Sequence, residues 1–145
     1  MKALIQRVTE ASVQVDGKVV GSIKQGLLVL LGVEKNDGQP EVEKMAKKLL
    51  AYRVFADEQG KMNCSVSDIK GGLLVVSQFT LAAETKKGLR PGFSSAAEPE
   101  KAKGLYESLL EHLNKSGLPI QAGQFSADMK VSLVNDGPVT FLLEI

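Results

Sequence analysis

The chain is poor in the residues that build metal sites and disulfides. It contains one histidine, His112, one cysteine, Cys64, and no tryptophan. Zinc sites draw several ligands mostly from cysteine and histidine, so this composition excludes them and leaves only oxygen ligands for any metal. A lone cysteine cannot form an internal disulfide, so nothing indicates a secreted protein. Histidine-based catalytic triads would depend entirely on His112.

An excess of one charge and long apolar runs are also missing. The 18 basic residues nearly balance the 17 acidic ones, which gives a formal net charge of +1. So weak a field argues against a binder of long duplex DNA, while a local contact with nucleic acid stays open. The longest apolar run, 27–31, is far shorter than the roughly 20 residues of a membrane helix. With no leader pattern at Met1, we expect a cytoplasmic protein.

The residues that are present describe one folded domain, 1–145. Of the 145 residues 43% are hydrophobic and 24% are charged, which is typical of a globular chain. Apolar residues at helical spacing predict one helix that begins near Pro40 and another that begins near Pro99 and ends by Gly117. Strand patterns surround these helices without regular alternation. We therefore predict an α+β fold with a largely antiparallel, barrel-like sheet and two main helices.

Strand patterns occupy most of the remaining chain. Polar and apolar residues alternate up to Val15, and Asp16-Gly17 then predicts a hairpin. The run 26–33 is apolar on both faces, so we expect it at the centre of the sheet. The other predicted strands are 53–56, 73–81, 120–125, 129–134 and 139–145.

The predicted strand 73–81 ends in the segment 77–81, SQFTL, in which three of the side chains are polar. On a strand, Gln78 and Thr80 would share a face with apolar Leu74 and Val76. Polar residues on such a face need partners. The stretch is therefore either a functional site or a strand that simply emerges into solvent.

Two further polar stretches have a functional and an ordinary interpretation. Residues 135–140, NDGPVT, predict first of all a turn, and a cis Gly137-Pro138 bond would aim a backbone acceptor at an amino group. Residues 85–93, TKKGLRPGF, suit a loop that contacts phosphates or a merely solvated loop.

Phe125 and Met129 offer stacking surfaces for a base, or are ordinary core residues.

Together these stretches closely resemble the bacterial-type D-aminoacyl-tRNA deacylases, also called D-tyrosyl-tRNA deacylases, over essentially the whole chain. The matching segments follow one another at the family's spacing: 6–8, 11–13, 77–81, 87–93 and 135–140. Each segment is a weak signal alone, and the set in order is a strong one. The chain departs from the family at Gly92, where serine typically follows the Arg-Pro pair.

The resemblance implies a hydrolase that cleaves the ester between a D-amino acid and the terminal adenosine of tRNA. It also implies that the enzyme removes glycine from mischarged alanine tRNA and acts in translation proofreading. The implied assembly is a homodimer with two active sites at the interface. Aminoacylated tRNA is then the partner, with no metal, no cofactor, no membrane and no DNA.

Residue roles follow from the same resemblance. The catalytic motif corresponds to Ser77, Gln78, Phe79 and Thr80. The Gly137-Pro138 pair matches a cis Gly-Pro motif that enters the partner subunit's site and rejects L-amino acids sterically, and Arg7 matches a residue that holds this motif. The remaining substrate-binding positions are Phe125 and Met129 for adenosine and the loop cations Lys87 and Arg90 for tRNA phosphates.

The chemistry fits a chain without a catalytic histidine. An aminoacyl ester beside a ribose 2′-hydroxyl is already activated, so backbone N–H groups near Phe79 and Thr80 could stabilise the oxyanion while water attacks. We favour an orienting role for Thr80 over a nucleophilic one, since no base lies nearby in the sequence. Two alternatives stay open: a noncatalytic module that binds RNA ends or nucleotides, and an esterase or peptidase that uses Ser77 or Thr80 on small substrates.

Overall fold

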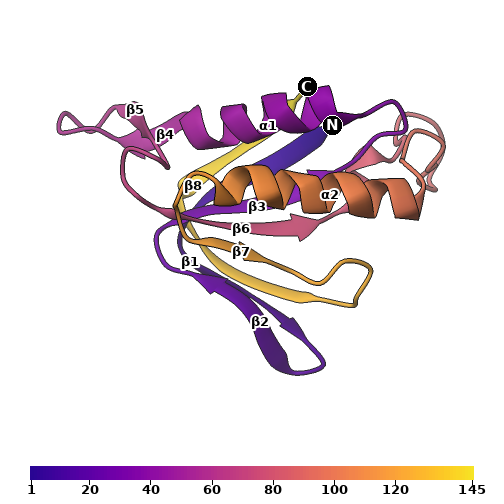
Figure 1. Cartoon of the computed structure of the whole chain (residues 1–145), viewed down its shortest axis with the longest axis horizontal. Coiled ribbons are helices and arrows are strands. Elements are labelled where there is room, and N and C mark those ends of the chain that lie inside the picture. The colour runs from indigo at the N-terminus through magenta and orange to yellow at the C-terminus, as the bar shows by residue number, and fades with distance from the viewer.

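A strongly curved sheet carries two helices on one side in the computed structural model, which describes residues 1–145 (Figure 1). The sheet has six strands: β1 (Lys2–Val15), β2 (Lys18–Ile23), β3 (Gly26–Gly32), β6 (Gly72–Ser77), β7 (Ile120–Ala122) and β8 (Lys130–Glu144). The helices are α1 (Gln39–Ala51) and α2 (Pro99–Asn114), and a short 3-10 helix, η1 (Phe79–Ala82), follows β6. Strands β4 (Arg53–Ala56) and β5 (Met62–Ser65) form a separate hairpin.

Strand β1 organises the sheet because it pairs antiparallel with β2, β3 and β8. The order is β2-β1-β3-β6-β7, and the β3–β6 and β6–β7 pairs are parallel. The two ends of this order approach each other closely: a Cβ built on Gly21 of β2 would lie 2.7 Å from the carbonyl oxygen of Ala122 in β7. The predicted α+β fold with a largely antiparallel, barrel-like sheet and two helices is confirmed.

The core has two parts, one on each face of β3. Leu27, Val29 and Leu31 belong to the larger cluster, which the helices cover, whereas Leu28 belongs to a smaller cluster inside the curved sheet. Because successive side chains of a strand point to opposite faces, β3 needs apolar residues throughout. The predicted central position of the run 26–33 is therefore confirmed.

Both helices have a proline in the first turn, as predicted, and each buries an apolar stripe. Pro40 lies in the first turn of α1, and Pro99 is the first residue of α2. The stripe of α2 contains Ala102, Leu105, Tyr106, Leu109 and Leu113. His112 lies off this stripe, and its Nδ1 is 2.8 Å from the carbonyl oxygen of Ser108. Neither helix, by its length and apolar content, could cross a membrane.

Candidate active site

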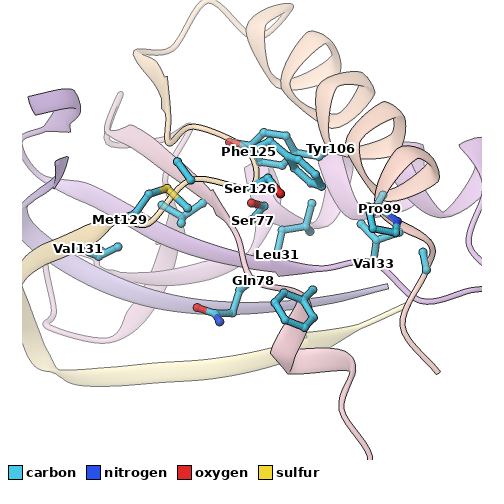
Figure 2. Close-up of a pocket in the computed structure, with 15 residues that line it drawn as sticks. Leu31, Val33, Ser77, Gln78, Pro99, Tyr106, Phe125, Ser126, Met129 and Val131 are labelled. Carbon is cyan, nitrogen blue, oxygen red and sulfur yellow. The ribbon is translucent and has the colours of Figure 1, made fainter. Parts of the chain in front are cut away.

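A pocket of about 430 Å³ opens between the end of β6, the start of α2 and the turn that joins β7 to β8 (Figure 2). Of its 15 lining residues, 11 are hydrophobic. The residues are Leu31, Val33, Val76, Ser77, Gln78, Phe79, Ala97, Pro99, Ala102, Tyr106, Phe125, Ser126, Ala127, Met129 and Val131. An apolar pocket with a few polar groups at one edge is the usual form of a small-ligand site.

The polar edge of the pocket is the turn after β6. The strand ends at Ser77, so the predicted strand 73–81 is wrong beyond that residue. The backbone N–H of Gln78 donates to the carbonyl of Leu31 at 2.7 Å, and the chain then turns into η1. Gln78 and Thr80 consequently do not continue the apolar face of Leu74 and Val76.

The turn leaves two backbone donors at the start of η1. Within the turn, the N–H of Leu81 donates to the carbonyl of Gln78 and the N–H of Ala83 to that of Thr80, each at 3.1 Å. The N–H groups of Phe79 and Thr80 precede these bonds, and the first N–H groups of a helix have no acceptor within it. They are therefore available to a bound anion or oxyanion.

The side chains around this turn differ in exposure. Ser77 and Gln78 are half-buried and face the pocket (Figure 2). Phe79 is 60% exposed, and its ring lies 5.1 Å from that of Phe93. Thr80 is exposed and does not line the pocket, but its Oγ1 accepts a hydrogen bond from Gln78 Nε2 at 2.5 Å.

The opposite wall is aromatic. The rings of Tyr106 on α2 and Phe125 in the β7–β8 turn lie 5.9 Å apart, and Figure 2 shows both above Ser77. The Tyr106 hydroxyl donates to the carbonyl of Val75 in β6 at 2.9 Å. Burial raises the pKa of Tyr106 to about 12, so this hydroxyl stays a neutral donor at physiological pH. Met129 completes this side of the pocket.

The Gly137-Pro138 pair lies on a bulge of β8 and not in a turn, so the predicted turn is wrong. Strand β8 pairs with β1 on both sides of the pair, with Asn135 opposite Val8 and Thr140 opposite Gln6. More residues separate Asn135 from Thr140 than separate Gln6 from Val8, so the extra chain projects from the sheet. The Gly137-Pro138 bond is cis, and both residues are exposed.

Arg7 fixes the start of this bulge. Its Nε donates to the carbonyl of Asp136 at 2.9 Å and lies 3.5 Å from the Asp136 carboxylate. Its guanidinium also donates to the carbonyl of Val54 in β4 at 2.7 Å. The Arg7 side chain is only 15% exposed, so it joins the bulge rigidly to the β4–β5 hairpin.

Lys87 and Arg90 lie on an exposed loop beside η1. The loop is closed at its base by two backbone hydrogen bonds between Glu84 and Gly92, at 2.8 and 3.0 Å. Both side chains are exposed to solvent, where they can contact phosphate groups, and neither lines the pocket.

The structure thus divides the predicted site residues among three places. The pocket brings together Ser77, Gln78, Phe79, Phe125 and Met129. Arg7, Gly137 and Pro138 form the bulge, whereas Lys87 and Arg90 belong to the loop, and Thr80 lies between pocket and loop. The structure has no group of three or more His, Cys, Asp or Glu side chains that could hold a metal ion.

Sequence reasoning missed part of the pocket wall. The helical pattern predicts Tyr106 only as a core residue of the α2 stripe, although it lines the pocket with its ring and bonds β6 with its hydroxyl. The one available signal is a polar atom on an otherwise apolar stripe, since buried tyrosine hydroxyls need a partner. Val33, Ala97 and Pro99 also line the pocket and give no signal.

Comparisons with known proteins identify the family of the chain. A family model described as D-Tyr-tRNA(Tyr) deacylase matches residues 4–144. Proteins named D-aminoacyl-tRNA deacylase from Shewanella sediminis and Shewanella amazonensis are 61% and 60% identical over 145 residues, covering 100% of both chains.

Solved structures are similar over the same length. One described as c-Myc DNA Unwinding Element Binding Protein is 48% identical, has a TM-score of 0.95, and is matched over 100% of this chain and 99% of that one. Another, described as a probable eukaryotic D-amino acid tRNA deacylase, is 14% identical with a TM-score of 0.87, over 99% and 98% of the two chains, and shows the shared fold. The chain therefore belongs to the D-Tyr-tRNA(Tyr) deacylase family and is a hydrolase of the D-aminoacyl-tRNA deacylase kind.

Proposed function

We propose that the pocket binds the terminal adenosine of a D-aminoacyl-tRNA and presents the ester to the turn at Phe79 and Thr80. The observation that carries this proposal is the meeting of the SQF segment with Phe125 and Met129 around one apolar pocket. A base can stack on the aromatic wall, where each stacked base contributes on the order of 1–3 kcal/mol in other nucleic-acid sites. The free amides of η1 lie at the edge of the same pocket.

In this reaction the chain supplies position and electrostatics. Water adds to the ester carbonyl, the oxyanion accepts hydrogen bonds from the Phe79 and Thr80 amides, and the acyl–oxygen bond then breaks. The proton that the attacking water gives up passes through the neighbouring ribose hydroxyl to the ribose oxygen, which leaves as a hydroxyl group. One oxyanion donor contributes roughly 3–4 kcal/mol where it has been measured. The products are a free D-amino acid and tRNA.

The bulge is the proposed chirality filter. Gly137 and Pro138 are exposed at its tip, and Arg7 holds its base, so the pair can enter the active site of a second subunit. There the side chain of an L-amino acid would collide with the backbone carbonyls of the pair, whereas a D-amino acid would turn its side chain away. Glycine has no side chain to reject, so glycine mischarged on alanine tRNA is also cleaved.

This arrangement requires a homodimer with active sites at the interface. Strand β8, which carries the bulge, pairs only with β1 and so has a free edge. It also exposes three large apolar side chains, Val134, Phe141 and Leu142, which a second copy would cover. As a proofreader of aminoacyl-tRNA, the dimer would work in the cytoplasm.

The experiment that tests the function is a deacylation assay with D-tyrosyl-tRNA, L-tyrosyl-tRNA and glycyl-tRNA(Ala). We expect rapid loss of the D-tyrosyl and glycyl esters and slow loss of the L-tyrosyl ester. Binding without ester loss would instead support a noncatalytic module for RNA ends. Equal activity on small esters without adenosine would support a general esterase.

Duplex DNA is the informative negative control. One similar structure carries a DNA-binding name, but a net charge of +1 offers little long-range attraction to a duplex. We expect no measurable competition by duplex DNA in the deacylation assay. Tight DNA binding without hydrolysis of any aminoacyl-tRNA would contradict the proposal.

A further inference from the structure

The bulge in β8 creates a problem of unpaired backbone groups. Between the pairs Gln6–Thr140 and Val8–Asn135, the chain leaves the ladder, so Arg7 of β1 has no partner residue in β8. At Val139 the chain is buried again, since this residue is only 6% exposed. Backbone N–H and C=O groups in such a position need hydrogen-bond partners, because a buried group that loses its bond to water and gains no other destabilises the fold.

One side chain, that of Asn135, supplies the missing partners. Its Nδ2 donates to the carbonyl of Arg7 at 3.3 Å and to the carbonyl of Val139 at 3.0 Å. Its Oδ1 accepts from the N–H of Val139 at 3.1 Å. The Asn135 amide therefore bonds both the N–H and the C=O of Val139, as a neighbouring strand would. It also donates to the Arg7 carbonyl of β1, which has no partner residue in β8.

Few side chains can make this set of bonds. It needs two donors and one acceptor close to the backbone, which among short side chains only asparagine provides. Aspartate keeps the acceptor for the Val139 N–H but brings a carboxylate against two carbonyl oxygens. Serine has one donor and cannot reach both ends of the loop at once.

We propose that Asn135 is a positioning residue of the chirality filter. Its side chain joins the two ends of the loop 135–139 by bonding the backbone of Val139, and Arg7 of β1 bonds the carbonyl of Asp136 in the same loop. Together they fix where Gly137 and Pro138 project. This inference rests on the proposed role of the Gly137-Pro138 pair in rejecting L-amino acids.

The first test compares kcat/KM for L-tyrosyl-tRNA and D-tyrosyl-tRNA in wild type, Asn135→Ser, Asn135→Ala and Asn135→Asp. We expect the L-to-D ratio to rise about tenfold in Asn135→Ala, less in Asn135→Ser and more in Asn135→Asp. A general loss of folding lowers both activities and leaves the ratio unchanged. Asn114→Ala, at the exposed end of α2, is the matched control and keeps the wild-type ratio.

The second test does not depend on chirality. Amide hydrogen exchange of Val139 reports the Asn135 contact directly, and we expect exchange about tenfold faster in Asn135→Ala than in Asn114→Ala. If wild type cleaves both isomers equally, the proposed filter fails whatever Asn135 does. If wild type discriminates and folded Asn135→Ala keeps both the ratio and the slow Val139 exchange, the positioning role of Asn135 is overturned.

Discussion

At the scale of single residues, Thr80 is the natural candidate for a nucleophile. Its Oγ1 accepts a hydrogen bond from Gln78 Nε2, and an amide nitrogen cannot remove the hydroxyl proton. No histidine, lysine or carboxylate side chain is hydrogen-bonded to the Thr80 hydroxyl, whose side-chain partner is the Gln78 amide. A threonine nucleophile needs a base within hydrogen-bond reach. The surroundings of Thr80 therefore suit an orienting role.

Thr80→Ala separates the two roles. We predict that the variant keeps measurable single-turnover deacylation of D-tyrosyl-tRNA, with a rate reduced less than about a hundredfold, because the backbone donors of η1 remain. Thr85→Ala, in the exposed loop, controls for the loss of a threonine. Complete loss of turnover with unchanged tRNA binding would instead make Thr80 the nucleophile.

The sequence pattern singles out the SQFTL segment, but the geometry of this segment could not be predicted from it. Threonine and phenylalanine favour strands, so the pattern extends β6 past Ser77. The strand stops because β3 ends beside it: a Cβ built on Gly32 would lie 2.8 Å from Leu81 Cβ. Only a glycine at that position lets η1 pack across the end of β3. That contact joins segments distant in sequence, and local pattern carries no sign of it.

At the scale of elements, the same limit explains the bulge. The predicted strands 129–134 and 139–145 both exist, and the Asn-Asp-Gly sequence between them is typical of a turn. The chain does not reverse there, because both halves of β8 pair with the same strand, β1. A sequence pattern shows that pairing is interrupted. It does not show whether the chain then reverses in a turn or continues along the same neighbouring strand after a bulge.

Tyr106 ties α2 to β6 through its hydroxyl on the Val75 carbonyl, and its ionisation gives an element-scale prediction. Burial raises its pKa to about 12, whereas tyrosine in an unfolded chain has a pKa of about 10. Below about pH 10 the phenol is neutral in both the folded and the unfolded chain. As pH rises from about 10 to about 12, only the unfolded chain releases the proton, so the free energy of unfolding falls.

We therefore compare the unfolding free energy of wild type and Tyr106→Phe by denaturant titration across this range. Near neutral pH, the variant is less stable by about 1 kcal/mol because it lacks the hydrogen bond. Between about pH 10 and 12 the wild type loses on the order of 2 kcal/mol that the variant does not lose, so the order of stability reverses. Tyr52→Phe, at a half-buried tyrosine, is the control. Parallel curves for wild type and Tyr106→Phe would contradict the prediction.

At the scale of the whole molecule, the sequence pattern predicted the class of fold with its barrel-like sheet, but not which strands pair in parallel. Helical and strand periodicities reflect burial of one face, which two helices over a sheet satisfy. The parallel β3–β6 and β6–β7 pairs, and the approach of β2 to β7, depend on how distant segments meet. The apolar run of β3 indicated its central position because burial on both faces leaves a mark in the sequence itself.

Net charge is the other whole-molecule property, and its effect on tRNA binding must be local. With a total of +1, attraction to tRNA depends on where cations are placed, and Lys87 and Arg90 share one exposed loop beside η1. Removing a single cation–phosphate pair makes the slope of log affinity against log salt shallower by about 0.7 for single strands. We predict that Lys87→Ala and Arg90→Ala each raise KM for D-tyrosyl-tRNA several-fold and reduce this slope by about that amount, with kcat unchanged.

Lys61→Ala is the matched control for these two variants. It removes an exposed lysine from the turn of the β4–β5 hairpin, which lies at the opposite end of the molecule from the loop 84–92 (Figure 1). All three variants lower the net charge by the same amount, so a purely global effect of charge would move their KM values and salt slopes together. If the loop contacts the acceptor end of tRNA, only Lys87→Ala and Arg90→Ala change, and identical behaviour of all three would exclude a specific phosphate contact by the loop.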